Sequence, residues 1–423
     1  MSAEPDGIET PPPPSVPSGP RFRPGRRLQV GAAVVAVAAA VTATVLVAGS
    51  GGSSKDDTKA AATAPADGLR HTAIEIAPGT CGSGWSAPKP GRQVFDLHNT
   101  SDTASEVYLD DPRTGKIFGE VDGLAPGTTR PLTVDLGSGS YAFKCLQNDT
   151  DAVTGPTVTV PGSLPQGPAA APVNQHDLIP PTLDYQKWVG GRIDELAAGT
   201  TRLKADIDRG DLAAARTDWL AAHLVYERMG AAYDTFGDAD GLINGTAART
   251  PGAAKDPDFT GFHRVEYGLW HGESAASLRA PAAALAGAVA GLRAGWPDQR
   301  MDPAAMGLRA HEIIENAEQF ELTARTDYGS GTNLATARAN LDGTRAILAR
   351  LRPLLVPRDP AVAQLDAALD RAQKDLDAQH HGAVWTPVGK LTLAQRERID
   401  ADFGDLLEQL APVATIFEVR RTA

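Results

Sequence analysis

A histidine and a glutamate in the segment TGFHRVEYGLW, His263 and Glu266, are the residues of this sequence with the clearest capacity for chemistry. Residues three apart lie on the same face of a helix, so this imidazole and this carboxylate could bind one cation together. An imidazole nitrogen with a carboxylate oxygen suits iron, manganese or zinc better than calcium. The pattern fixes only two residues, and an ordinary helix with a surface ion pair through Arg264 is the alternative.

Carboxylates in other segments could complete such a site. Bundle proteins take their metal ligands from facing helices. The segment YERMGAAYDTFGDAD holds Glu227 and Asp234, and the segment HEIIENAE holds Glu315. Glu315 stands where the H-E-x-x-H motif of zinc peptidases has its second histidine, so that motif is incomplete. We therefore predict His263 and Glu266 as metal ligands, with Glu227, Glu315 and Asp234 as candidates for the remaining positions.

The segments that carry these residues all have helical spacing. Seven or eight apolar-periodic stretches follow one another over residues 181–421, and proline or glycine separates most of them. Helices with short connections form a bundle. We predict a helical metal-binding domain over residues 181–421, preceded by a proline-rich linker at 163–180.

A different pattern precedes that linker. Residues 69–162 consist of short runs in which apolar and polar residues partly alternate, and Pro, Gly or Asp interrupts them about every ten residues. This pattern is typical of a small Greek-key sandwich. The predicted fold class is thus multi-domain, with an all-β sandwich followed by an all-α bundle.

The N-terminal part of the chain predicts a membrane anchor. Residues 1–27 are rich in Pro and end in several arginines, which is typical of a disordered cytoplasmic tail. The apolar run within residues 28–49 is long enough to cross a bilayer core of roughly 30 Å, and a cleaved signal sequence is the alternative. A flexible linker at 50–68 follows. Either alternative places the two folded domains outside the cytoplasmic membrane, in the cell envelope or periplasm.

The net charge of the chain indicates which classes of partner it can bind. The formal net charge is −12, and the sequence pI is about 5.2. Nucleic-acid binding calls for a clustered basic face, so we exclude nucleic acid as a partner. An acidic protein outside the membrane suits the handling of cations.

The helical segments resemble the iron-uptake proteins of the EfeO type. The resemblance lies in YERMGAAYDTFGDADGLIN, DPDFTGFHRVEYGLW and NLATARANLDGTRAILARLRPLL, and it covers most of residues 180–420. Its most specific piece is G-x-H-x-x-E, matched by Gly261, His263 and Glu266, which that family uses as the metal site of an imelysin-like (M75) bundle. EfeO proteins often carry a second glutamate soon after Y-E-R, where this sequence has Gly230. Asp234 could supply that carboxylate instead.

The resemblance implies a function. EfeO-type proteins are the extracytoplasmic iron-binding part of a three-part transporter, together with a membrane permease and a haem peroxidase of the DyP type. We therefore expect this chain to bind Fe²⁺ or Fe³⁺, to deliver it to a permease, and not to be an enzyme. The alternative is a metal-dependent peptidase, as the name of the M75 group implies.

The β region resembles the N-terminal cupredoxin-like domain that many EfeO proteins carry, through IAPGTC, LAPGTTRPLTVDLGSGSYAFKC and PTVTVP. A blue-copper centre needs two histidines and a cysteine, and no histidine or methionine follows Cys145 in LQNDTDAVTGPTVTVP. Two alternatives remain for Cys81 and Cys145. They could form a disulfide, which the oxidising compartment favours. They could instead bind a metal ion, such as copper, with Glu106 or another carboxylate, which the resemblance favours.

Overall fold

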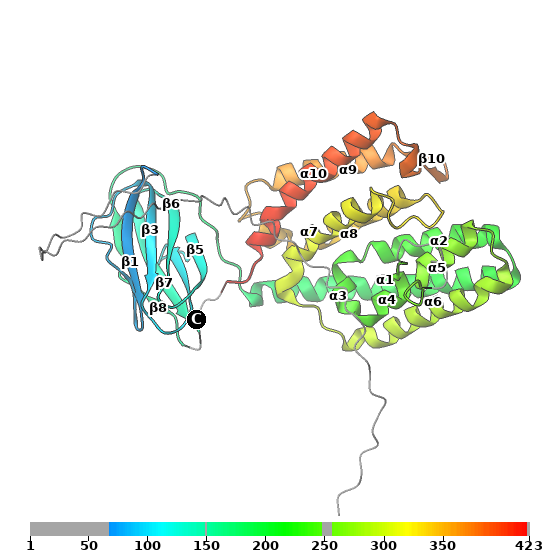
Figure 1. The fold of residues 1–423 in the computed structure, drawn as a ribbon, viewed down its shortest axis with the longest axis horizontal. Coiled ribbons are helices and arrows are strands. Elements are labelled where there is room, and N and C mark those ends of the chain that lie inside the picture. The colour runs from blue at the N-terminus through cyan, green and yellow to red at the C-terminus, as the bar shows by residue number, and fades with distance from the viewer. Residues whose placement is uncertain (1–66, 149, 248–255, 421–423) are drawn as a thin grey trace, which may run out of the picture. The chain divides into compact units, whose positions relative to one another are not determined.

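The computed structural model describes residues 67–148, 150–247 and 256–420 of the 423-residue chain (Figure 1). A β domain comes first and a helical domain follows, which confirms the predicted order of fold classes. The predicted cytoplasmic tail, the predicted membrane anchor and nearly all of the linker after it lie outside the described residues.

The β domain consists of two sheets that share one apolar core. In the first sheet, β1 and β3 run parallel and the other neighbours are antiparallel. The strand order of this sheet is β2 (Thr80–Ser83), β1 (Arg70–Ala77), β3 (Gly91–Asn99) and β6 (Thr129–Leu136). The second sheet is antiparallel, in the order β5 (Ile117–Leu124), β4 (Ser105–Asp110), β7 (Gly139–Gln147) and β8 (Val153–Thr154), and β9 (Val158–Val160) also pairs with β7.

A disulfide joins the two sheets. Cys81 in β2 and Cys145 in β7 are bonded, with their Cα atoms 5.8 Å apart, and both are buried. Of the two alternatives for these cysteines, the structure therefore has the disulfide, and the metal site with Glu106 is not formed. Neighbouring residues of a strand point to opposite faces. Val107 pairs with Cys145, so the adjacent Glu106 faces away from the disulfide, where it accepts a hydrogen bond from the Tyr108 hydroxyl.

The helical domain begins with the longest helix, α1. Asn174 caps α1 through a reciprocal pair of hydrogen bonds with Asp177, and Gly210 ends it in a left-handed conformation. The helix thus starts inside the predicted proline-rich linker and includes Pro180 and Pro181. Burial of Leu178 against the core holds this first part of α1 in place.

The helices pack around one continuous apolar core. Helix α1 packs against α2 and α6, α8 contacts α1, α2, α7 and α9, and α10 packs against α7 and α9. The bounds are α1 (Gln175–Arg209), α2 (Leu212–Glu227), α3 (Tyr233–Phe236), α4 (Asp238–Asn244), α5 (Gly261–Trp270), α6 (Ala275–Gly295), α7 (Met306–Asn316), α8 (Asn333–Leu355), α9 (Val362–Asp377) and α10 (Leu393–Ile416). A π-helical turn, Ala317–Glu321, directly follows α7.

One segment of the described chain, Ala275–Asp298, is long and apolar enough to cross a membrane by length and composition alone. It comprises α6 and the turn after it. Leu278, Leu285 and Val289 of α6 are buried in the core that α6 shares with α1. The segment is therefore an alanine-rich helix that packs within the bundle.

Candidate metal centre

The start of α5 fits closely against the end of α4. Gly261 opens α5 with φ +61°, a left-handed conformation that favours glycine. A Cβ at this position would lie 1.8 Å from the carbonyl oxygen of Ile243 in α4. The Thr260 hydroxyl also donates to a carbonyl oxygen of α4 at 2.6 Å. The glycine of the G-x-H-x-x-E pattern thus permits the contact that brings Asn244 next to His263.

His263 is held in the form that binds metals. Its side chain is 3 % exposed, and its Nδ1 lies 3.2 Å from the carbonyl oxygen of Asn244. Since a carbonyl only accepts, Nδ1 carries the proton and the lone pair is on Nε2. Burial, and then the positive charge of His223, lower the pKa of His263 to about 4. The imidazole is therefore neutral at pH 7, as a metal ligand must be.

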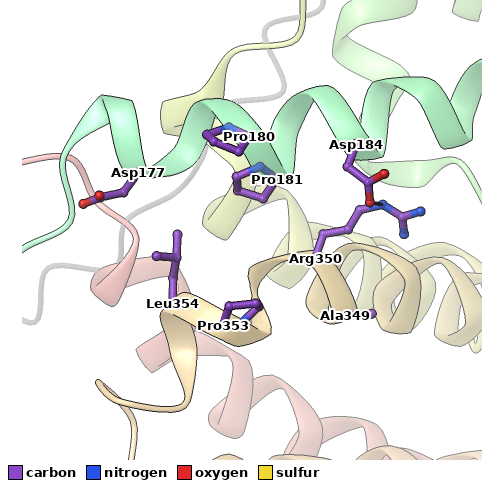
Figure 2. A pocket seen from close by; sticks show the side chains of 8 residues that line it. All are labelled: Asp177, Pro180, Pro181, Asp184, Ala349, Arg350, Pro353 and Leu354. Atoms are coloured by element: carbon purple, nitrogen blue, oxygen red, sulfur yellow. Dashed lines mark ion pairs between the residues drawn. The ribbon is translucent and has the colours of Figure 1, made fainter.

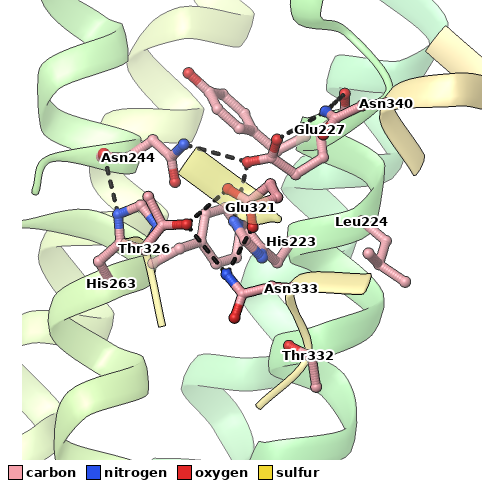
Figure 3. Close-up of polar contacts among 12 residues, drawn as sticks. His223, Leu224, Glu227, Asn244, His263, Glu321, Thr326, Thr332, Asn333 and Asn340 are labelled. Atoms are coloured by element: carbon pink, nitrogen blue, oxygen red, sulfur yellow. Dashed lines mark hydrogen bonds and ion pairs between the residues drawn. The ribbon is translucent and has the colours of Figure 1, made fainter. Parts of the chain in front are cut away.

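Glu227, the last residue of α2, belongs to the polar cluster in Figure 3. It is 6 % exposed, and its Oε1 lies 3.0 Å from Nε2 of His223, one turn earlier in α2. The amide of Asn244 donates to Oε1 at 3.2 Å, while the Tyr233 hydroxyl and the Asn340 amide donate to Oε2 at 3.2 and 3.1 Å. Burial alone would raise the pKa of Glu227, but the pairing with His223 lowers it.

Glu321 contributes a second carboxylate to this cluster from the π-helical turn after α7 (Figure 3). A π-helical turn inserts a residue into the helix and turns the following side chains to a new direction, often at functional sites. The Glu321 carboxylate accepts from the Thr326 hydroxyl at 2.7 Å and from the Asn333 amide at 2.8 Å. Burial, and then the negative charge of Glu227, raise the pKa of Glu321 to about 7.

Glu266 shares α5 with His263 but has different partners. It is 1 % exposed, and its Oε1 accepts the backbone N–H groups of Tyr328 and Ser330 at 3.1 and 3.0 Å. Burial raises the pKa of Glu266 to about 7. The Tyr328 ring in turn lies against His263 and Phe259, with ring centroids 5.1 and 4.8 Å apart. The loop before α8 therefore covers the cluster from the side of α5.

These side chains form a buried site in which carboxylates outnumber positive charges. Among the described residues, no lysine or arginine forms an ion pair with Glu227, Glu266 or Glu321, and the only charge partner is the imidazole of His223. Burial alone would lower the pKa of His223, but Glu227 raises it. Nδ1 of His223 and Oδ1 of Asn244 are buried without a hydrogen-bond partner in the described chain. A bound cation stabilises buried carboxylates and an orphaned acceptor such as Oδ1 of Asn244.

The chemistry of the donors fits iron, manganese or zinc, because the cluster offers imidazole nitrogen and carboxylate oxygen. Within the described residues, however, no group of three or more His, Cys, Asp or Glu side chains is placed to hold one ion as it stands. For several of these residues to bind one ion, their side chains therefore have to turn toward it.

The structure brings together some of the predicted ligands and not others. His263 and Glu227 lie in the cluster, whereas two predicted carboxylates do not. Asp234 is exposed on α3 and pairs with Arg309 at 3.0 Å. Glu315 is half-buried on α7 and accepts a hydrogen bond from the Gln319 amide at 3.0 Å. The two isoleucines before Glu315 take the buried positions of α7, so the Glu315 side chain is directed away from the core.

Two residues of the cluster were not among the predicted ligands. They are His223 and Glu321. His223 lies four residues before the predicted ligand Glu227 in HLVYE, a spacing that places both on one helix face and could have identified His223. Glu321 had no such signal, because its direction depends on the π-helical turn, which breaks the regular helical spacing.

A cavity of about 580 Å³ lies elsewhere in the helical domain, between α1 and α8 (Figure 2). Its polar residues are Arg350, which pairs with Asp184 at 2.9 Å, and Asp177, which belongs to the cap of α1. The remaining lining is apolar and consists of Pro180, Pro181, Ala349, Pro353 and Leu354. With no imidazole and its charges already engaged, this cavity does not offer a metal site.

Comparisons with known proteins agree with the resemblance predicted from the sequence. The sequence pattern of the imelysin family, peptidase M75, matches residues 182–413, more than half of the chain. The relatives include the iron uptake system component EfeO of Yersinia pestis, 28 % identical over 331 residues, which are 76 % of this chain and 84 % of the relative. The same component of Escherichia coli (strain K12) is 26 % identical over 326 residues, with the same two coverages.

These relatives support a role in iron uptake. The family match spans the helices that carry His263, Glu227 and Glu321, so the buried cluster lies within the matched region. The chain therefore belongs to the imelysin family, and its similarity is to iron uptake components of the EfeO type.

Proposed function

We propose that this chain is the extracytoplasmic iron-binding component of an iron uptake system, which captures iron and delivers it to a membrane permease. One observation carries the proposal. Glu227 and Glu321 are buried beside the neutral imidazole of His263, and no lysine or arginine among the described residues neutralises them. The names of the relatives, iron uptake system components, support iron as that cation.

The three side chains would act in different ways. His263 offers the lone pair of Nε2, while Glu227 and Glu321 supply two negative charges that balance Fe²⁺ and most of the charge of Fe³⁺. Iron then replaces the imidazolium of His223 as the counter-charge of Glu227, and binding releases protons from the cluster. A site of carboxylates and one imidazole exchanges its iron more readily than a thiolate site, as delivery requires.

The setting of the protein belongs to the same proposal. The apolar segment at residues 28–49 would tether the chain to the membrane with both folded domains outside. Tethering raises the effective concentration of the carrier near its permease. A haem peroxidase of the DyP type would be the third component. The Cys81–Cys145 disulfide suits an oxidising compartment of this kind.

Anaerobic calorimetric titration of the full chain with Fe(II) tests the proposal. We expect one tight site in the wild type, and a loss of affinity of at least about tenfold in His263→Ala, since a ligand is removed. His381→Ala is the matched control, because His381 is exposed at the end of β10 (His380–His381). No binding by the wild type, or equal binding by His263→Ala, would overturn the assignment.

A further inference from the structure

The loop that leads into α8 has a shape fixed by its own residues. The Asp327 side chain accepts the backbone N–H groups of Gly329 and Gly331 at 2.8 and 3.0 Å. Both glycines have positive φ, +126° and +67°. A Cβ at Gly329 would lie 2.8 Å from Cβ of Trp270 in α5, so only glycine permits this approach. The sequence thus builds a compact loop that lies directly against α5.

This loop closes the side of the cluster where His263 lies. The Tyr328 ring stands between the rings of Phe259 and His263. Its hydroxyl accepts the backbone N–H of Ala247 at 3.1 Å. His263 is 3 % exposed in this arrangement, so an ion reaches its imidazole only when a covering group moves.

Glu266 connects this loop to α5. A single oxygen, Oε1, accepts the N–H groups of Tyr328 and Ser330. A carboxylate oxygen has two lone pairs, so two hydrogen bonds occupy its capacity. Oε1 of Glu266 is therefore engaged as an anchor for the loop, and a cation bound by that oxygen would have to displace the two N–H groups.

We propose that Glu266 is a positioning residue that holds the Tyr328 loop, residues 327–332, closed over the iron site, and that it is not itself an iron ligand. The proposal rests on the iron-binding function proposed above, and it assigns the two members of the H-x-x-E pattern to different tasks. His263 binds the ion. Glu266 sets how fast the ion enters and leaves.

The two possible roles of Glu266 respond differently to substitution. Glu266→Gln keeps Oε1 as an acceptor for both N–H groups but removes the charge. Glu266→Ala removes the acceptor as well. An anchor is thus rescued by glutamine, whereas a ligand that balances the charge of iron is not.

Iron exchange in the full chain separates these roles. Fe(II) release to the chelator ferrozine and Fe(II) capture are followed by anaerobic stopped flow. We expect Glu266→Ala to release and capture iron at least about tenfold faster, with a smaller change in equilibrium affinity, and Glu266→Gln to stay close to the wild type. Equal losses of affinity in Glu266→Gln and His263→Ala would overturn the proposal, because they identify Glu266 as a ligand.

Hydrogen exchange of the metal-free protein provides a test that does not depend on iron. We expect the amides of Tyr328 and Ser330 to exchange at least about tenfold faster in Glu266→Ala than in the wild type, and Glu266→Gln to protect them. His381→Ala is the control and should leave these amides protected, because His381 is exposed in β10 and far in sequence from the loop. Unchanged exchange in Glu266→Ala would refute the anchor. A wild type that binds no iron but shows the expected exchange pattern would instead refute the proposed function and retain the anchor.

Discussion

Replacing Glu321 with glutamine should stabilise the metal-free protein at alkaline pH and weaken its binding of iron. The wild-type carboxyl is buried, with its pKa raised to about 7 from an ordinary value of 4.5. Glutamine has nearly the same shape and keeps both hydrogen bonds, since its oxygen can accept from the Asn333 amide while its nitrogen donates to the Thr326 hydroxyl. The substitution therefore removes mainly the buried charge.

The size of the effect follows from the pKa shift. Because the folded state binds a proton more tightly than the unfolded state, wild-type stability falls as pH rises from about 4.5 to about 7 and stays low above it. At 1.36 kcal/mol per pKa unit, the full loss is about 3 kcal/mol at pH 8 and about 1 kcal/mol at pH 5. Glu321→Gln lacks this dependence, so its stability relative to the wild type should improve by about 2 kcal/mol between the two pH values.

Urea denaturation of the metal-free full chain at pH 5 and pH 8, followed by far-ultraviolet circular dichroism, measures this difference in the helical domain. Any pH-independent effect of the glutamine cancels in the comparison. Glu315→Gln is the matched control, because Glu315 lies near the same end of α7 but is half-buried and outside the cluster. A gain that is equal at both pH values, or no gain at pH 8, would refute the reasoning that a buried uncompensated charge weakens the metal-free fold.

Four further substitutions test other parts of the structure. Asp234→Asn and Glu315→Gln should each leave Fe(II) affinity within about twofold of the wild type by calorimetry, because both side chains lie outside the cluster; a tenfold loss would return them to the ligand set. Gly261→Ala should destabilise the helical domain by about 2 kcal/mol or more in urea denaturation, because its φ is positive and a carbonyl occupies the space of the Cβ. Cys81→Ser should lower the stability of the β domain by about 4 kcal/mol, the value expected when a disulfide that closes a loop of this length is removed. Hydrogen exchange of the amides in β3 and β7 measures this loss. Amides of the helices that exchange faster to the same extent would contradict it.

The sequence predicted the order of the domains and the helix that carries the metal-site pattern. Period-two and helical spacing are local properties, so they located the β region and α5 with His263 and Glu266. The direction of a side chain depends on the helical phase, and the π-helical turn after α7 changes that phase. For this reason the spacing gave no signal for Glu321, whereas Glu315 lies outside the site because Ile313 and Ile314 take the buried positions of α7. The hydrogen-bond partners of Glu266 come from a loop some sixty residues away in the sequence. The spacing of residues within α5 could not predict those partners.

The family name includes a peptidase group, and the chemistry of the cluster bears on that alternative. A metallopeptidase needs a metal position open to a peptide carbonyl and a general base near it. Glu227 and Glu321 are 6 % and 9 % exposed, and Glu266 is engaged by loop amides, which leaves it badly placed to activate water. A carrier needs the opposite properties, namely a closed site that is rich in carboxylates and binds an ion reversibly. If Glu266 only positions the loop, Glu266→Gln should retain iron exchange. Metal-dependent cleavage of peptides by the wild type that is lost in Glu266→Gln would instead assign the chain to the peptidases.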